Sequence, residues 1–317
     1  MTQSCLVTGG AGFIGSHIAD ALVRRGDRVR VIDDLCTGNL GNLESIRDQI
    51  EFVEADILDE SALASAMQGV DLVFHQAALA SVPLSLEQPE KVHEACATGT
   101  LNVLRYAHGA GVKRVVYAAS SSCYGDQPFA SNREADSLHC LSPYAAAKLA
   151  GELYCQAFYE SFGLETVVLR YFNVFGPRQD PDSAYSAVIP LFITWLLSGK
   201  PPVVYGDGHQ SRDFTYISNV VNGNLLAGSV PAAAGQTLNL ANGRSTTLLE
   251  LLDALKHLLD VDISPDFQPA RQGDVRDSLA DISRAVAVLN YSPAVGMEEG
   301  LRCSIDYYRS IIQPTSS

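Results

Sequence analysis

The chain has little that would place it in a membrane or in an oxidising compartment. No apolar run reaches the roughly 20 residues that a transmembrane helix requires. The seven cysteines are odd in number and form no CxxC pair. This argues against a disulfide framework or a structural zinc site and favours reduced thiols in the cytoplasm. No basic stretch followed by an apolar run opens the sequence, so we expect no signal peptide.

Positive charge is also scarce. The formal net charge is −14 and the sequence pI is about 4.8. A long-range attraction to nucleic acid or to an acidic membrane is therefore not expected. Any anionic ligand must be held by local groups, such as backbone N–H groups at helix N-termini or a few arginines. We also expect no bound metal.

What the chain does contain is a regular alternation of strand-length apolar runs and helical segments through residue 172. The apolar runs cover 4–9, 28–33, 51–57, 71–77, 114–120 and 166–172. The helical segments cover 14–25, 60–67, 89–109 and 143–162. Near-continuous apolar strands separated by helices predict an α/β fold, a doubly wound parallel sheet covered by helices on both faces.

The pattern loosens after residue 173. A loop rich in Pro, Gly and Asp precedes a helix over 187–199, a short strand over 201–208, helices over 218–228 and 247–259, and a strand over 236–241. We predict a Rossmann-type cofactor domain over 1–173, with return segments near 211–240. A smaller mixed α/β substrate domain would be formed mainly by 174–317.

A glycine-rich turn lies where the first strand gives way to the first helix. Gly9, Gly12 and Gly15 are spaced GxxGxxG in "VTGGAGFIGSH", unlike the GxGxxG of the usual dinucleotide fingerprint. Such a turn lets the backbone approach a pyrophosphate, although the same glycines also suit a plain tight turn. Asp33 ends the second strand. A carboxylate there binds ribose hydroxyls and repels a 2′-phosphate, so NAD is favoured over NADP.

The stretch "SPYAAAK" places Tyr144 and Lys148 one turn apart on one helix face. Ser142 suits the cap of this helix and Pro143 its first turn. On spacing alone, the pair also fits a packed tyrosine and a solvated lysine. A tyrosine has a pKa of about 10 and is a weak base at neutral pH, but a nearby ammonium and the positive nicotinamide ring of NAD⁺ favour the phenolate. Tyr144 can then act as a general base on a substrate hydroxyl.

The glycine turn, the acidic strand end and the YxxxK helix together resemble the short-chain dehydrogenase/reductase superfamily. Further stretches narrow the resemblance to its extended branch and, from end to end, to the UDP-glucose 4-epimerase family, closest to bacterial UDP-N-acetylglucosamine 4-epimerases. These stretches are "TGGAGFIGSH", "HQAA", "YAASSSCYGDQP", "LSPYAAAK", "LRYFNVFGPRQDP", "GDGHQSRDFTYI" and "GDVRDSLADI". The resemblance implies an NAD-dependent isomerase that oxidises a UDP-sugar to a transient 4-keto form and reduces it on the other face.

The resemblance also assigns residues. Ser120 joins Tyr144 and Lys148 as the catalytic set, and Lys148 also holds the nicotinamide ribose. The cofactor would be bound by Gly9, Gly12, Phe13, Ile14, Gly15, Asp33, Asp34, Thr37, Gly38, Asp56, Ile57, Gln76, Ala77, Ala78, Tyr144, Lys148 and Phe172. The substrate would be bound by Ser120, Ser121, Ser122, Asn173, Ala187, Val188, Arg212, Arg271, Asp274 and Ser278. Arginines suit a diphosphate, because their planar donors pair with two oxygens at once.

Ser121 and Ser122 separate the possible reactions. The sugar-nucleotide 4,6-dehydratases that resemble this chain carry Asp-Glu at these positions, and the UDP-glucuronate decarboxylases carry Glu at the second. Two serines leave no carboxylate for elimination chemistry, which disfavours a lyase. A non-catalytic NAD-binding protein on the same fold is disfavoured by the intact pair of Tyr144 and Lys148.

In the family, the position of Ser278 gates the C2 substituent of the sugar. A bulky residue excludes an acetamido group and a small one admits it, so we expect interconversion of UDP-GlcNAc and UDP-GalNAc, with UDP-glucose or a UDP-uronate as the alternative. Cys96 departs from the family, which usually has an asparagine there that helps to position the active site. A thiol is a weaker hydrogen-bond partner. Because the family pairs the helices at 89–109 and 143–162 between subunits, a homodimer is also expected.

Overall fold

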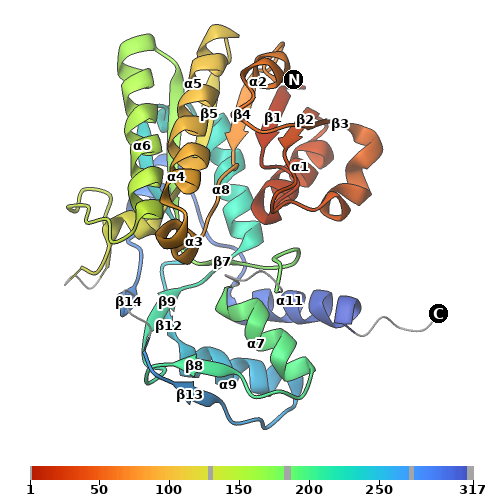
Figure 1. Ribbon diagram of the computed structural model, residues 1–317, viewed down its shortest axis with the longest axis vertical. Helices are drawn as coiled ribbons and strands as arrows, with labels where there is room; N and C mark the ends of the chain where they lie inside the picture. The colour runs from red at the N-terminus through yellow and green to blue at the C-terminus, as the bar shows by residue number, and fades with distance from the viewer. Residues whose placement is uncertain (1, 128–130, 182–186, 271–274, 313–317) are drawn as a thin grey trace.

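The computed structural model describes residues 2–127, 131–181, 187–270 and 275–312. At its centre is a seven-stranded sheet with the strand order β11-β6-β5-β4-β1-β2-β3 (Figure 1). Every neighbouring pair in this sheet is parallel. The strands are β1 (Ser4–Thr8), β2 (Arg28–Asp33), β3 (Ile50–Glu54), β4 (Leu72–His75), β5 (Arg114–Ser120), β6 (Glu165–Tyr171) and β11 (Gln236–Leu240). The predicted doubly wound parallel sheet is confirmed.

Helices cover both faces of the sheet, because its strands are apolar on both sides. One face carries α1 (Phe13–Arg25), α8 (Ile217–Ser229) and α10 (Ser283–Leu289). The other carries α2 (Glu60–Ala66), α5 (Gly99–Gly109) and α6 (Pro143–Phe162). Successive residues of β1 enter opposite cores: Cys5 and Val7 pack under the first set of helices, and Leu6 under the second.

The helix predicted over 89–109 is not regular. It consists of α4 (Pro89–His93), a π-helical turn at Glu94–Thr98, and α5. Thr100 Oγ1 donates a 2.6 Å hydrogen bond to the carbonyl of Cys96 within this turn. A short helix, α3 (Val82–Glu87), precedes α4 and is absent from the sequence prediction.

The chain leaves the sheet after β6 and returns to it later. β11 pairs in parallel with β6, and α8 packs against α1, so residues 217–240 belong to the layers of the large sheet. Residues 217–240 fall within the stretch near 211–240 that was expected to return to the cofactor domain. The domain boundary at residue 173 stays a prediction.

A second lobe lies beyond the carboxyl ends of the strands, below the sheet in Figure 1. Its helices are α7 (Val188–Leu197), α9 (Leu248–Leu259) and α11 (Met297–Ile312). Its strands are β7 (Val174–Phe175), β8 (Val203–Tyr205), β9 (Ser211–Asp213), β10 (Thr215–Tyr216), β12 (Ser245–Thr247), β13 (Asp266–Gln268) and β14 (Asp277–Ser278). A separate apolar core formed by α7, α9 and α11 holds the lobe together.

Two observations bear on the compositional expectations. Among the described helices, none is long and apolar enough to cross a membrane. The seven cysteines are all free thiols.

Candidate active site

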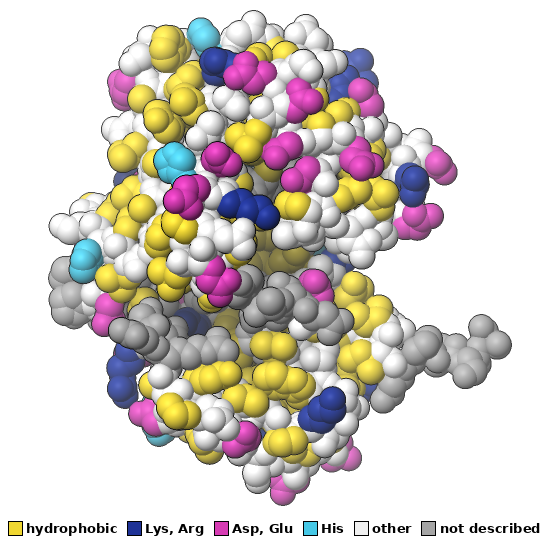
Figure 2. All heavy atoms as spheres, in the orientation of Figure 1, with side chains coloured by type: hydrophobic (Ala, Val, Ile, Leu, Met, Phe, Trp, Pro, Cys, Tyr) yellow, Lys and Arg dark blue, Asp and Glu magenta, His cyan; other side chains and the backbone are white. Residues whose placement is uncertain are grey.

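The strand order reverses between β1 and β4, so the chain leaves these two strands in opposite directions and opens a crevice at their carboxyl ends. The sheet-end cavity, of about 720 Å³, lies there and is lined by the glycine turn, the end of β5 and the start of α6. The Asp56 cavity, of about 220 Å³, continues from it past the end of β2. In Figure 2 the surface is hollowed between the two lobes.

The glycine turn needs its glycines for space. Gly9 has a φ of +65°, and a Cβ there would lie 2.6 Å from the backbone nitrogen of Ala77. A Cβ at Gly15 would lie 2.1 Å from the carbonyl oxygen of Gly9. Helix α1 begins after Gly12 without a side-chain cap or an acidic residue in its first turn. Its first N–H groups are therefore available to an anion.

Asp33 ends β2 beside this turn. Its carboxylate accepts hydrogen bonds of 2.9 Å from the backbone N–H groups of Ala11 and Leu35. Burial raises the pKa of Asp33, and these backbone hydrogen bonds oppose that shift. Each carboxylate oxygen keeps further acceptor capacity for a ribose hydroxyl.

The structure places most of the residues expected to bind the cofactor around the two cavities. Those lining the sheet-end cavity are Gly9, Gly12, Phe13, Ile14, Gly15, Asp33, Thr37, Gln76, Ala78, Tyr144 and Lys148. Those lining the Asp56 cavity include Asp34, Asp56, Ile57 and Ala77.

Two of the expected residues line neither cavity. A Cβ at Gly38 would lie 2.5 Å from Asp33 Oδ1, so Gly38 lets the loop pass behind that carboxylate. Phe172 is fully buried in a cluster with Tyr124 and Ala241. Its side chain supports the end of β6 from within, because an apolar ring there is removed from water by the core.

Helix α6 is anchored firmly at the position from which it presents its polar residues. Ser142 caps it by accepting from the N–H of Ala145 at 3.2 Å, and Pro143 occupies the first turn, as predicted. Arg170 of β6 forms a two-pronged ion pair with Glu152 of α6, at 3.0 and 2.5 Å. Both partners are buried, so the pair fixes the helix against the sheet at a defined height.

Ser120, Tyr144 and Lys148 are brought together in the sheet-end cavity. Ser120 lies close enough to Tyr144 for its hydroxyl to favour the phenolate. Ser120 Oγ accepts from Ser122 N at 3.2 Å and from Ser122 Oγ at 2.9 Å. Ser121 and Ser122 begin a short 3₁₀ turn and do not line this cavity.

Burial dominates the electrostatics of the pair. It raises the pKa of Tyr144, and the hydrogen bond from Ser120 opposes the rise. It also lowers the pKa of Lys148. The ammonium and the nicotinamide ring that are expected to favour the phenolate must therefore act against burial, because desolvation penalises the charged form of both groups. A cation in the cavity would shift the balance towards the phenolate.

These residues fit an NAD molecule. The glycine turn leaves room for a pyrophosphate at the N-terminus of α1, and Asp33 faces the region where the adenosine ribose would lie. Lys148 and Tyr144 stand at the opposite end of the sheet-end cavity, at the edge formed by β5 and α6. The sheet-end cavity thus has polar side chains at both ends and main-chain groups of the glycine turn between them, which suits a dinucleotide.

Cys96 lies in the π-helical turn and is fully buried. Its Sγ approaches the carbonyl oxygen of Leu79 at 4.0 Å, and burial raises the pKa of the thiol. A neutral thiol with one weak contact makes no strong hydrogen bond to the active site.

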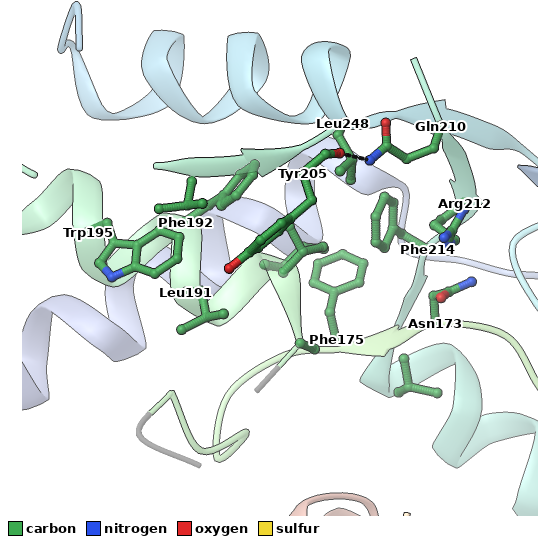
Figure 3. Close-up of a pocket in the computed structure, with 15 residues that line it drawn as sticks. Asn173, Phe175, Leu191, Phe192, Trp195, Tyr205, Gln210, Arg212, Phe214 and Leu248 are labelled. Atoms are coloured by element: carbon green, nitrogen blue, oxygen red, sulfur yellow. Dashed lines mark hydrogen bonds between the residues drawn. The ribbon is translucent and has the colours of Figure 1, made fainter. Parts of the chain in front are cut away.

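A further hollow, the second-lobe cavity of about 260 Å³, begins at Asn173 and Val174, which also line the sheet-end cavity. Figure 3 shows that its wall is largely aromatic, with Phe192, Trp195 and Tyr205 on one side and Arg212 at the end near Asn173. Gln210 donates a 2.6 Å hydrogen bond to the carbonyl of Tyr205. Ala187, Val188 and Arg212, three predicted substrate residues, line this cavity.

Arg212 and Ser278 are adjacent across two paired strands. β14 runs parallel to β9, with Ser278 in register with Arg212. Arg212 Nη1 donates to the carbonyls of Ser211 and Arg276, at 2.9 and 3.0 Å, which orients the guanidinium. Ser278 is half-buried. Arg271 and Asp274, which were also expected to bind substrate, lie outside the described residues.

Sequence reasoning missed several polar residues of the sheet-end cavity. Gln179 lines it, and among the described residues its buried Oε1 has no hydrogen-bond partner. An unpaired buried acceptor beside a cavity is suited to a ligand donor. Tyr171 also lines it and donates 2.9 Å to Asn224 of α8. Gln179 falls within the quoted stretch "LRYFNVFGPRQDP", which was the available signal.

Comparison with known proteins places this geometry in a family. The model of the NAD dependent epimerase/dehydratase family matches residues 5–241. UDP-glucose 4-epimerase of Mycolicibacterium smegmatis is 36% identical, over 96% of this chain and 98% of that protein.

Two solved structures are similar over nearly their whole length. UDP-N-acetylglucosamine 4-epimerase from Methanobrevibacter ruminantium, solved with UDP-N-acetylmuramic acid, has a TM-score of 0.94 and 39% identity, over 98% of this chain and 99% of that one. UDP-glucuronic acid 4-epimerase from Bacillus cereus, solved with UDP-glucuronic acid and NAD, has a TM-score of 0.91 and 31% identity, over 97% and 99%. The chain belongs to the NAD dependent epimerase/dehydratase family, within the extended short-chain dehydrogenase/reductase branch that contains the UDP-glucose 4-epimerases.

Proposed function

We propose that this NAD-dependent UDP-sugar 4-epimerase interconverts UDP-GlcNAc and UDP-GalNAc. The observation that carries the epimerase chemistry is that Ser120, Tyr144 and Lys148 line one cavity together with the glycine turn. The two residues after Ser120 are serines, so the strand end offers no carboxylate for elimination.

Tyr144 would take the proton of the C4 hydroxyl as its carbon is oxidised, and return it on reduction. Bound NAD supplies reversible hydride transfer at that carbon, and its positive ring favours the Tyr144 phenolate. Ser120 would bridge the phenol and the sugar hydroxyl. Lys148 would keep the phenolate charge balanced and hold a ribose hydroxyl. Because the cofactor is regenerated in each cycle, no external oxidant is needed.

The second-lobe cavity is suited to the nucleotide. Its aromatic wall can bury a uracil ring. Helix α7 begins at Val188 without a side-chain cap or an acidic residue in its first turn, so its first N–H groups can bind a diphosphate. Arg212 stands at the end of this cavity nearest Asn173, between the proposed uracil position and the sheet-end cavity. Its guanidinium would pair with a second phosphate oxygen.

The acetamido preference rests on Ser278. This small side chain lies beside Arg212, where the sugar would follow the diphosphate. A small residue there leaves room for a C2 substituent larger than a hydroxyl. The similarity to a UDP-N-acetylglucosamine 4-epimerase supports the same choice, while the similar glucose and glucuronate epimerases define the competitors.

The test is to mix purified protein with UDP-GlcNAc, without added cofactor, and to follow the anomeric protons by NMR. We expect UDP-GalNAc to accumulate to equilibrium and UDP-glucose and UDP-glucuronate to react more slowly. Much faster turnover of UDP-glucose or of the uronate would overturn the sugar assignment. A keto-deoxy or pentose product would indicate a lyase, and no reaction with any UDP-sugar would contradict the proposed chemistry.

We also propose that the protein is a homodimer through α4 to α6. Leu153, Tyr154 and Phe162 of α6 are exposed, and a groove between α4 and α6 is lined by Pro89, His93, Ala146 and Ala150. An apolar helix face of this kind is typical of an interface. Light scattering should give a mass near twice 34.0 kDa; a monomer at micromolar concentration would refute the proposal.

A further inference from the structure

Lys148 is buried without a conventional partner for its charge. The residue is only 3% exposed. An ammonium has three hydrogen-bond donors, yet among the described residues no oxygen accepts from its Nζ. An aromatic face lies near the ammonium instead: Nζ of Lys148 is 4.4 Å from the centroid of the Tyr117 ring. That distance is within the range of a cation–π interaction, which strengthens when both groups are removed from water.

Tyr117 contacts Lys148 at two places. Its ring lies by the ammonium, and its hydroxyl donates a 3.0 Å hydrogen bond to the main-chain carbonyl of Lys148. Tyr117 belongs to β5 and is fully buried, so the ring cannot swing into solvent. One strand residue therefore fixes both ends of the lysine.

Gly151 makes this arrangement possible. A Cβ at Gly151 would lie 2.3 Å from the Tyr117 hydroxyl oxygen and 2.7 Å from its Cζ. Glycine lowers helix stability by about 1 kcal/mol relative to alanine in a helix interior. Its presence in α6, one turn after Lys148, is explained by the space that the tyrosine occupies.

His75 holds the ring in place from a second strand. Its ring centroid is 5.5 Å from that of Tyr117. His75 Nδ1 lies 2.7 Å from Thr8 Oγ1, and Nε2 lies 3.0 Å from Thr100 Oγ1. Since the Thr100 hydroxyl donates to the Cys96 carbonyl, it must accept from Nε2–H, which leaves Nδ1 to accept from Thr8.

This hydrogen-bond chain fixes a neutral imidazole. Burial and, to a smaller extent, the nearby Lys148 charge lower the pKa of His75 to about 3. Thr8 immediately precedes the glycine turn, and its Oγ1 accepts from the N–H of Ala77 at 3.3 Å. Hydrogen bonds therefore connect His75, which packs against the Tyr117 ring, both to the glycine turn and to the π-helical turn.

We propose that Tyr117 is a positioning residue whose aromatic face holds the Lys148 ammonium at the place from which it acts on Tyr144. This rests on the roles assigned to Tyr144 and Lys148 under the proposed function. The ring attracts the cation without accepting a proton from it. A carboxylate in its place would neutralise the charge that Tyr144 needs, whereas the ring keeps the full charge directed at the cavity.

The prediction concerns the acid limb of the pH–rate profile, so every titratable group near the pair matters. From the sheet these are His75 and Tyr117, from the π-helical turn Cys96, and from α6 and the turn after β5 Cys155 and Cys123. Burial raises the pKa of each of the three thiols and lowers that of His75. All four are neutral across the assay range, which leaves Lys148 as the charged neighbour from the protein.

The experiment replaces Tyr117 by phenylalanine and then by 4-fluoro- and 3,4,5-trifluorophenylalanine. Fluorine withdraws electron density from the ring face and weakens its attraction for a cation while nearly preserving its shape. We expect Tyr117→Phe to keep the acid limb of kcat close to that of the parent enzyme. The fluorinated rings should move the acid limb stepwise to higher pH, by roughly one pH unit in total. At pH values below the limb, kcat should then fall about tenfold, and at pH values above the limb it should be normal.

Trifluorophenylalanine at Phe158 is the matched control. Phe158 lies in the same core as Tyr117 but makes no contact with Lys148, so its acid limb should not move. A graded shift at position 117 alone supports the proposal. An unmoved limb, or an equal loss of kcat at every pH, overturns it, as does a Tyr117→Phe enzyme that folds, retains NAD and is inactive. Near-normal activity of Tyr144→Phe, measured alongside, would instead refute the proposed function.

Discussion

The two cavities proposed to hold the cofactor and the nucleotide are built in different ways. The sheet-end cavity is formed at strand ends and by a glycine turn, so much of its ligand contact comes from backbone groups whose position the sheet fixes. The second-lobe cavity is walled by side chains from β7, α7, β8, β9 and the start of α9. A backbone-lined site tolerates few changes of sequence, because an added atom collides with main chain. A site made of side chains can change its ligand by single substitutions.

Tyr144→Phe should give the largest effect, since Tyr144 stands where the two ligands would meet. Removing one oxygen takes away the proton acceptor and leaves both binding regions intact. We expect turnover to fall by about 10³-fold or more, with NAD content and nucleotide binding unchanged. Stopped NMR assays and the absorbance of bound cofactor measure this. If substantial turnover remained, the base would have to be another group.

Gly15→Ala should break the backbone-lined region specifically. Its Cβ would lie 2.1 Å from the Gly9 carbonyl, and the turn would have to open. Overpacking of this kind costs about 1–3 kcal/mol, which corresponds to roughly a five- to 150-fold loss of NAD affinity. The matched control is Gly109→Ala in α5, where no atom lies within 4 Å of the added Cβ. Equal NAD content in the two variants would show that the turn does not bind the cofactor.

Arg212→Met should affect only the side-chain-lined region. Loss of a charge-assisted pair with a phosphate is worth about 1.5–3 kcal/mol, so the KM for the UDP-sugar should rise about tenfold or more. NAD retention should not change. Arg276→Met is the control, because Arg276 is an exposed neighbour whose side chain faces Asp207. A KM that rises equally in both variants would point to general charge and not to a phosphate contact at Arg212.

Ser278→Tyr should have the smallest effect on the enzyme as a whole, and the most selective one. A bulky ring beside Arg212 would narrow the space for the C2 substituent. We expect kcat/KM for UDP-GlcNAc to fall roughly fivefold relative to UDP-glucose. Ser245→Tyr, at an exposed position at the start of β12, serves as the control. An unchanged ratio of the two sugars would remove Ser278 from the specificity site.

The sheet-end residues could be predicted in detail because they follow local rules. Gly9 and Gly15 are fixed by the turn, Asp33 by the end of a strand, and Tyr144 and Lys148 by helical spacing. The irregular π-helical turn at Cys96 could not be predicted, because it depends on the Thr100 hydroxyl and on packing against other elements. The burial of the Phe172 ring could not be predicted for the same reason, because only packing decides which way a ring at a strand end points; its expected contact with the cofactor stays a prediction.

By itself the sequence determined the alternation of strands and helices, the glycine turn and the placing of Tyr144 and Lys148 on one helix face. Each depends on residues close together in the chain, where backbone geometry leaves few alternatives. The tertiary structure alone decided the pairing of Ser278 with Arg212, the aromatic second-lobe cavity, and the contact of the Tyr117 ring with the Lys148 ammonium. These contacts join segments that are far apart in the sequence. The burial of apolar surface and the register of paired strands select which segments meet, and local propensity does not.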